Sequence, residues 1–98
     1  MLKIPLSQDK DQSFNITLAE QNCFMRVYEA GDGAMYMDLS VQDRTVVTGA
    51  RCVYGIFVLL YRQMLFKGNF LFVTIDKKDP QSKDFGINTK LFYVEDDD

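Results

Sequence analysis

The side chains with catalytic or ligating potential in this chain are carboxylates and two cysteines, because its 98 residues include no histidine. Without an imidazole, a serine or cysteine nucleophile lacks the base that the familiar catalytic triads supply. Asp32, Asp38 and Asp43 are close enough in sequence to form a carboxylate pair for acid–base chemistry. However, Asp32 and Asp43 fall in predicted turns, where carboxylates commonly accept hydrogen bonds from backbone N–H groups. We therefore predict that the protein is not an enzyme.

The same residues offer little to a cofactor or a metal ion. The glycines of Gly31-Asp32-Gly33 could approach a phosphate, but a phosphate-binding loop should also carry a lysine and begin a helix. The acidic loops lack the ligand spacing of known calcium sites. Two distant cysteines without a histidine cannot complete a zinc site. We predict no cofactor, and we interpret Cys23 and Cys52 as buried free thiols, with a single disulfide as the alternative.

Charge and composition argue against two further classes of protein. The net charge of −3 and the pI near 4.8 disfavour a nucleic-acid-binding module, because phosphate binding needs a concentrated basic surface. The chain has no run of the roughly 18 apolar residues that cross a bilayer and no secretory signal at its N-terminus. We expect no membrane partner and no sequence-specific nucleic-acid partner.

The elements that must position these residues are predicted to be short strands. Apolar and polar side chains alternate over five segments, which is typical of half-buried strands. These segments are residues 1–6, 13–18, 23–28, 34–40 and 45–51. Pro5 lacks an N–H group and should place the first strand at a sheet edge, and Gly49 indicates a bulge in the fifth. Gly31-Asp32-Gly33 and Asp43-Arg44 predict hairpin turns.

Three later segments follow other patterns. Residues 70–75 are apolar at five of six positions, which predicts a central strand. Residues 90–95 carry large apolar side chains on both faces, so we predict a strand that is buried on both faces or meets another subunit on one of them. Alternation stops in the apolar block 56–61, and we predict one short helix near residues 56–64.

Together these elements predict an all-β, mainly antiparallel fold. About seven strands with one short helix suit a small sandwich or a partly open barrel. Residues 1–94 are predicted to form a single β-rich domain. Residues 95–98 are four consecutive acids, which predict a solvated tail or, as the alternative, a segment that docks on a basic surface.

The chain carries more aromatic residues than a core of this size needs, with eight Phe and five Tyr. Some rings could therefore be buried between subunits, the alternative being an unusually aromatic core. The candidate partner interface consists of Phe66, Phe70, Phe72, Phe85, Phe92 and Tyr93.

Several short segments, taken in order along the chain, carry a resemblance to a known family. They are Ile4-Pro5-Leu6, Asp11-Gln12-Ser13-Phe14 with Leu18, Met35-Tyr36-Met37-Asp38-Leu39, Val47-Thr48-Gly49 running on to Leu59-Leu60-Tyr61, and Leu91-Phe92-Tyr93-Val94. With these segments the chain resembles the small baseplate plug proteins of contractile-tailed bacteriophages, including the plug of a cyanophage baseplate. The resemblance extends from about Ile4 to Glu95.

The resemblance implies a structural protein of the virion, located in the tail baseplate and assembled in the host cytoplasm. It implies packing against hub, spike and tube proteins at the end of the tail tube. The symmetry of phage tails also implies a homo-oligomer, either a trimer or a hexamer. Two alternatives stay open: a free-standing β-barrel module that binds a peptide or protein by strand addition at the edge with Pro5, and a tail-tube or sheath-initiator protein.

Overall fold

The computed structural model describes residues 2–59 and 66–95, and these residues form seven β-strands and one turn of 3-10 helix. The elements are β1 (Leu2–Ile4), β2 (Asp11–Leu18), β3 (Gln21–Glu29), β4 (Met35–Val41), β5 (Arg44–Arg51), β6 (Asn69–Thr74), η1 (Ser82–Asp84) and β7 (Thr89–Val94). Every pairing between named strands is antiparallel. The prediction of an all-β, mainly antiparallel fold is therefore confirmed.

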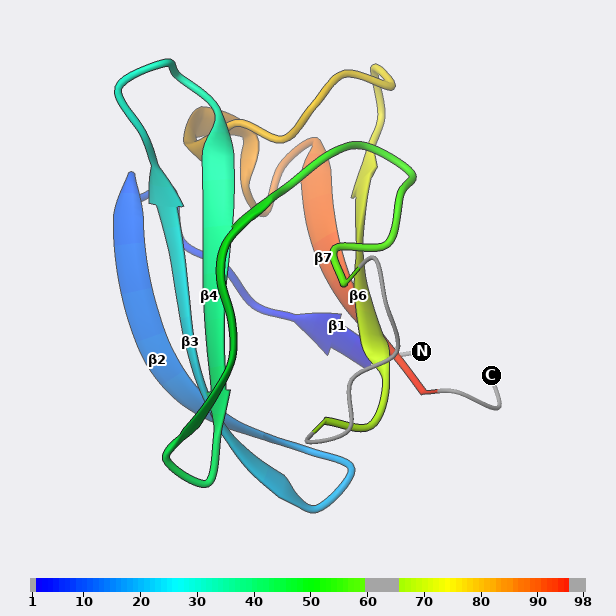
Figure 1. Cartoon of the computed structure of the whole chain (residues 1–98). Coiled ribbons are helices and arrows are strands. Elements are labelled where there is room, and N and C mark those ends of the chain that lie inside the picture. The colour runs from blue at the N-terminus through cyan, green and yellow to red at the C-terminus, as the bar shows by residue number, and fades with distance from the viewer. Residues whose placement is uncertain (1, 60–65, 96–98) are drawn as a thin grey trace.

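The strands form two sheets that face each other (Figure 1). The large sheet has the order β2-β3-β4-β5, so each of its strands pairs with its neighbours in sequence. The small sheet has the order β1-β7-β6 and joins the first strand of the chain to the last, with Ile4 opposite Leu91. Neither sheet closes on itself, so the architecture is the sandwich rather than the barrel.

Two tight hairpins fix the register of the large sheet without any glycine. Ala19 and Glu20 link β2 to β3, and Gln42 and Asp43 link β4 to β5, all four with φ between 49° and 65°. Two-residue turns with positive φ at both positions match the twist of antiparallel strands, which outweighs the local strain in residues that carry a Cβ.

A bulge interrupts the pairing of β4 with β5, as predicted from Gly49. Two steps along β4, from Met37 to Leu39, correspond to three steps along β5, from Ala50 to Val47. Gly49 has a φ of +68°, and its N–H donates a hydrogen bond of 2.7 Å to Oδ1 of Asp38. The carboxylate therefore satisfies the backbone donor that the bulge removes from the ladder.

The core lies between the two sheets and is rich in aromatic rings. The large sheet contributes aliphatic and thioether side chains, and the small sheet contributes mostly rings. Fully buried members include Met25, Val27, Met37, Leu39, Ile4, Phe70, Phe72, Leu91 and Tyr93. Phe66 stacks on Phe70 with ring centroids 5.4 Å apart, and Phe72 stacks on Phe85 at 6.2 Å. This interior matches the second of the two interpretations of the aromatic residues, an unusually aromatic core.

Two predictions about the second half of the chain are wrong. Residues 56–59 are not helical, and residues 60–64 of the predicted helix lie outside the described residues. The segment before residue 60 instead runs beside β6: Tyr54 forms a parallel bridge with Phe72, and the N–H of Val58 donates to the carbonyl of Phe70 at 3.0 Å. The open edge of β6 offers unpaired backbone groups, and hydrogen bonds to these groups hold residues 54–58 in a turn and bends rather than in a helix.

The same geometry corrects the position of β6. It was predicted to be a central strand, but β7 is central in the small sheet and β6 is its last strand. Pro5 follows β1, which pairs only with β7, so the predicted sheet edge at the N-terminus is confirmed.

Both cysteines are free and buried, as expected. Burial raises the pKa of the Cys52 thiol to about 12 and also raises the pKa of Cys23. Among the described residues, no helix has the length and apolar character of a membrane span.

Candidate interaction surface

Asp32 and Asp38, two of the carboxylates considered for acid–base chemistry, accept hydrogen bonds from the backbone. Asp32 accepts a hydrogen bond from the N–H of Ala34 at 3.0 Å and one from the hydroxyl of Tyr36 at 2.9 Å, and these two bonds lower the pKa of its carboxyl. Asp38 holds the bulge at Gly49. Within residues 2–59 and 66–95, no group of three or more Cys, Asp or Glu side chains is arranged to hold a metal ion.

The outer face of the large sheet carries a polar network centred on Arg26. Its Nε and Nη2 donate to the two carboxylate oxygens of Asp11 at 3.0 and 2.7 Å. The guanidinium lies 4.2 Å from the ring centroid of Tyr28, and its Nη1 lies 4.0 Å from Asp38. The bond from Arg26 lowers the pKa of Asp11 and raises that of Arg26. The charge of Arg26 is thus matched by carboxylates of its own chain.

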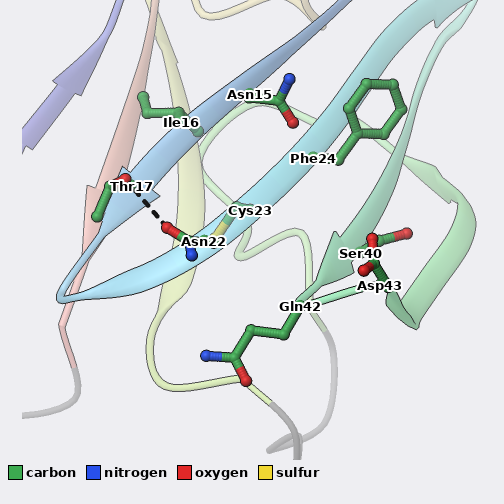
Figure 2. A pocket seen from close by; sticks show the side chains of 9 residues that line it. All are labelled: Asn15, Ile16, Thr17, Asn22, Cys23, Phe24, Ser40, Gln42 and Asp43. Atoms are coloured by element: carbon green, nitrogen blue, oxygen red, sulfur yellow. Dashed lines mark hydrogen bonds between the residues drawn. The ribbon is translucent and has the colours of Figure 1, made fainter.

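The same face contains a shallow hollow of about 630 Å³ near the two turns that link β2 to β3 and β4 to β5 (Figure 2). Amide, hydroxyl and carboxylate side chains surround one half-exposed ring, that of Phe24. The lining residues are Asn15, Ile16, Thr17, Asn22, Cys23, Phe24, Ser40, Gln42 and Asp43. Water solvates such a lining well, so the hollow does not by itself require a ligand.

The outer face of the small sheet has the opposite character. Successive residues of a strand point to opposite faces, and the buried positions of β6 and β7 fix which face looks outward. The outward side chains are mostly aliphatic or aromatic: Leu71, Val73, Ile75, Phe92 and Val94. We call these five residues the apolar face. Within the described residues, no strand covers it.

The members of the apolar face are neighbours in the sheet register. Leu71 lies opposite Phe92, and Val73 lies two residues along β6 from Leu71. Ile75 continues the row, because its N–H donates to the carbonyl of Asn88 at 2.9 Å just beyond β6. Val73 and Ile75 are 41% and 77% exposed, and the other three members are half-buried. A contiguous apolar strip of this kind on a sheet surface is typical of a protein–protein contact.

Five of the six rings in the sequence-predicted partner interface lie in the chain's own core. Phe66, Phe70, Phe72, Phe85 and Tyr93 are each at most 4% exposed, and a partner has no access to side chains at that burial. Phe92 belongs to the apolar face and is the one member of the predicted set that stays accessible. For Phe92, burial between chains stays a prediction.

Sequence reasoning missed the aliphatic members of this surface, although a signal was present. The apolar run at residues 70–75 showed that neither side of the strand could face water without exposing large side chains. That pattern predicts burial on both faces. In the part of the chain that the structure describes, the large sheet buries one face and no strand covers the other.

The comparison with protein families agrees with the resemblance of the sequence. The family model described as "Cyanophage baseplate Pam3 plug gp18" matches residues 1–97 of the 98-residue chain. A comparison with curated proteins finds no match. Such a plug is a structural component of the phage tail baseplate, and membership implies contact with other tail proteins. The match covers almost the whole chain, and we conclude that this protein belongs to the cyanophage baseplate plug family.

Proposed function

We propose that this plug is held in the baseplate by packing its apolar face against a hub or spike protein at the end of the tail tube. The observation that carries the proposal is the contrast between the two outer faces of one sandwich. The large sheet faces outward with charges paired inside the chain, whereas the small sheet faces outward with Leu71, Val73, Ile75, Phe92 and Val94. A protein that works inside an assembly can keep such a strip because assembly buries it.

The apolar face supplies a useful but limited free energy. Fully burying one large apolar side chain contributes about 1.5–3 kcal/mol, and these five side chains are already partly buried, so about 1 kcal/mol each is a reasonable scale. A sum near 5 kcal/mol is comparable with the entropy that association costs. The contact therefore suits one side of a multi-protein assembly better than a free binary complex.

The edge with Pro5 offers less to a partner. β1 is only three residues long, from Leu2 to Ile4, so a peptide that added a strand there would gain few ladder hydrogen bonds. The free-standing strand-addition module is therefore the weaker proposal. The predicted trimer or hexamer and the acidic tail at residues 95–98 stay predictions; in the tail, Glu95 lies 3.9 Å from Nζ of Lys67.

A photo-crosslinking amino acid in place of Val73, carried in assembled virions, tests the proposal. We expect ultraviolet light to join the chain to a hub or spike protein. The matched control places the same amino acid at Asn15, an exposed position on the outer face of the large sheet. Equal yields of the same product from both positions, or no product from position 73 in intact virions, would show that the apolar face is not the contact.

Val73→Asp gives an independent measure. It should reduce the amount of plug per virion while leaving the free energy of unfolding within about 0.5 kcal/mol of the parent chain, because the side chain is exposed. Asn15→Asp is the control for an added charge. A Val73→Asp plug that is incorporated normally would contradict the proposal.

A further inference from the structure

Two lysines share the outer face of the small sheet with the apolar side chains. Lys90 points outward from the central strand β7 and lies opposite Val73, and Lys3 points outward from β1 and lies opposite Phe92. Both residues are exposed. The two ammonium groups therefore lie among and beside the residues of the apolar face.

Neither of these lysines forms an ion pair with another described residue. This distinguishes them from Arg26 on the large sheet, whose charge is matched by Asp11. The residues that point outward from the small sheet thus carry two positive charges and no carboxylate. Water solvates these charges as long as the face is open.

Covering the apolar face removes that water, above all from Lys90. An ammonium group that loses its hydration without gaining a charged partner costs several kcal/mol. That cost is as large as the whole apolar contribution of the face. A partner must therefore bring acceptors to these positions, and carboxylates are the acceptors that compensate an ammonium most fully.

A second copy of the chain does not meet this requirement. Packing two such faces together would oppose two apolar strips but would gather four ammonium groups with no carboxylate from either face. Like charges in a desolvated contact oppose association and act against wrong partners. Contact through this face is therefore disfavoured between copies of the plug.

We propose that the apolar face docks on a different protein, one whose surface sets an apolar strip beside carboxylates that receive Lys90 and Lys3. The inference rests on the proposed function, and it adds the chemistry of the partner. The lysines also fix how the partner is oriented, because they lie toward one side of the row formed by Leu71, Val73 and Ile75. An anionic membrane fits this surface less well, because the apolar side chains lie along a flat sheet and do not extend from a loop.

Zero-length carbodiimide coupling in intact virions tests the partner's chemistry directly, since it joins an ammonium group only to a carboxylate in contact with it. We expect Lys90 or Lys3 to form an amide with an Asp or Glu of another tail protein. The isolated chain treated in the same way identifies products that form within the plug. Lys10, which lies 3.9 Å from Glu29 of its own chain, is the internal control and should give an intrachain product.

The outcomes separate this inference from the proposed function. A photo-crosslink from position 73 to another tail protein, with no coupling of Lys90 or Lys3, would overturn the inference and leave the proposed function standing. Coupling of these lysines to a second copy of the plug would overturn it as well. Failure of the photo-crosslink itself would remove the proposed function.

Charge variants supply the second readout. Lys90→Glu should reduce plug incorporation about tenfold more than Lys90→Gln, because it sets like charges against each other. Lys10→Glu is the matched control and should have no such effect. Equal effects of Lys90→Glu and Lys90→Gln would contradict the inference. Vesicles of equal parts phosphatidylglycerol and phosphatidylcholine supply a further test. If they bind the isolated chain, and Lys90→Glu abolishes that binding, the inference is also contradicted.

Discussion

Replacing Gly68 by alanine should destabilise the fold more than any other glycine-to-alanine change in the described chain. Gly68 has a φ of +108°, and a Cβ at this position would lie 2.5 Å from a ring carbon of Tyr93 and 2.6 Å from its hydroxyl oxygen. Tyr93 is 2% exposed, and its hydroxyl donates a 2.5 Å hydrogen bond to the carbonyl of Lys67. The ring is also packed against Phe66 and Phe70, so it cannot move away freely.

Two other glycines allow the cost to be divided into its causes. Gly31 has open space around it and no positive φ, so Gly31→Ala should change the free energy of unfolding by less than about 0.5 kcal/mol. Gly33 also has open space but a φ of +83°, so Gly33→Ala should cost about 1–2 kcal/mol from backbone strain alone. Gly68→Ala adds overpacking against Tyr93, worth about 1–3 kcal/mol. We therefore expect a total of about 2–5 kcal/mol, a large share of the roughly 5–15 kcal/mol available to a domain of this size.

Urea unfolding of the three variants, followed by fluorescence at fixed temperature, gives these differences if the slope m stays constant. Tyr93→Leu provides a double-mutant cycle, because removing the ring should lower the cost of Gly68→Ala to about that of Gly33→Ala. If Gly68→Ala lowers the free energy of unfolding by no more than Gly33→Ala does in the parent chain, the ring of Tyr93 adds no cost at this position. The same holds if the effect of Gly68→Ala is unchanged when Tyr93 is replaced.

Three further outcomes follow from individual contacts. The side chain of Asn69 accepts a hydrogen bond from the N–H of Leu59 at 2.9 Å and donates one to its carbonyl at 2.8 Å. Asn69→Ala should therefore lower the free energy of unfolding by about 2–3 kcal/mol and speed hydrogen exchange at the amide of Leu59. An unchanged exchange rate would argue against this role of Asn69. The hydrogen bond from Arg26 holds the pKa of Asp11 below its ordinary 3.8, so its stabilising effect is present above that pH and is lost as pH falls through the folded-state value. The stability difference between the parent chain and Asp11→Asn should therefore be larger at pH 7 than at pH 3, and equal differences at the two pH values would contradict this. The thiol of Cys52 is 1% exposed, and its pKa is raised to about 12. It should therefore react with an aromatic disulfide reagent at pH 8 no faster than the chain unfolds. Rapid labelling of the native protein would show instead that the site opens locally.

The strands were predictable because their signals are local. The alternation of Met35, Met37 and Leu39 with polar neighbours identified β4, and the structure buries all three side chains. The bulge at Gly49 and the edge at Pro5 were also predictable, since each depends on the backbone chemistry of one residue. The conformation of residues 56–59 was not predictable, and the predicted helix there is wrong, because these residues follow the open edge of a strand that lies later in the sequence.

The candidate surface could be predicted only in part for the same reason. The sequence predicts Phe92 as an interface residue, but it predicts a central strand at residues 70–75 and so gives no sign that the aliphatic row on β6 is exposed. In residues 70–75 both faces read as apolar, and no local pattern says which one a distant sheet will cover. The larger rings of Phe70 and Phe72 gain more from burial than Leu71 and Val73, and this difference settles the choice once the two sheets meet.

The sequence alone was enough to show that this chain is a β-protein with strands at defined places, that it belongs to the baseplate plug family, and that Asp32 and Asp43 lie in turns. Hydrophobic period, turn chemistry and the order of the motifs are all properties of the sequence itself. The pairing of β1 with β7, the packing of the aromatic rings in the interior, and the position of Val73 and Lys90 on one outward face are seen only in the folded chain. These features depend on contacts between residues far apart in sequence, and the energy of such contacts is set by which surfaces meet.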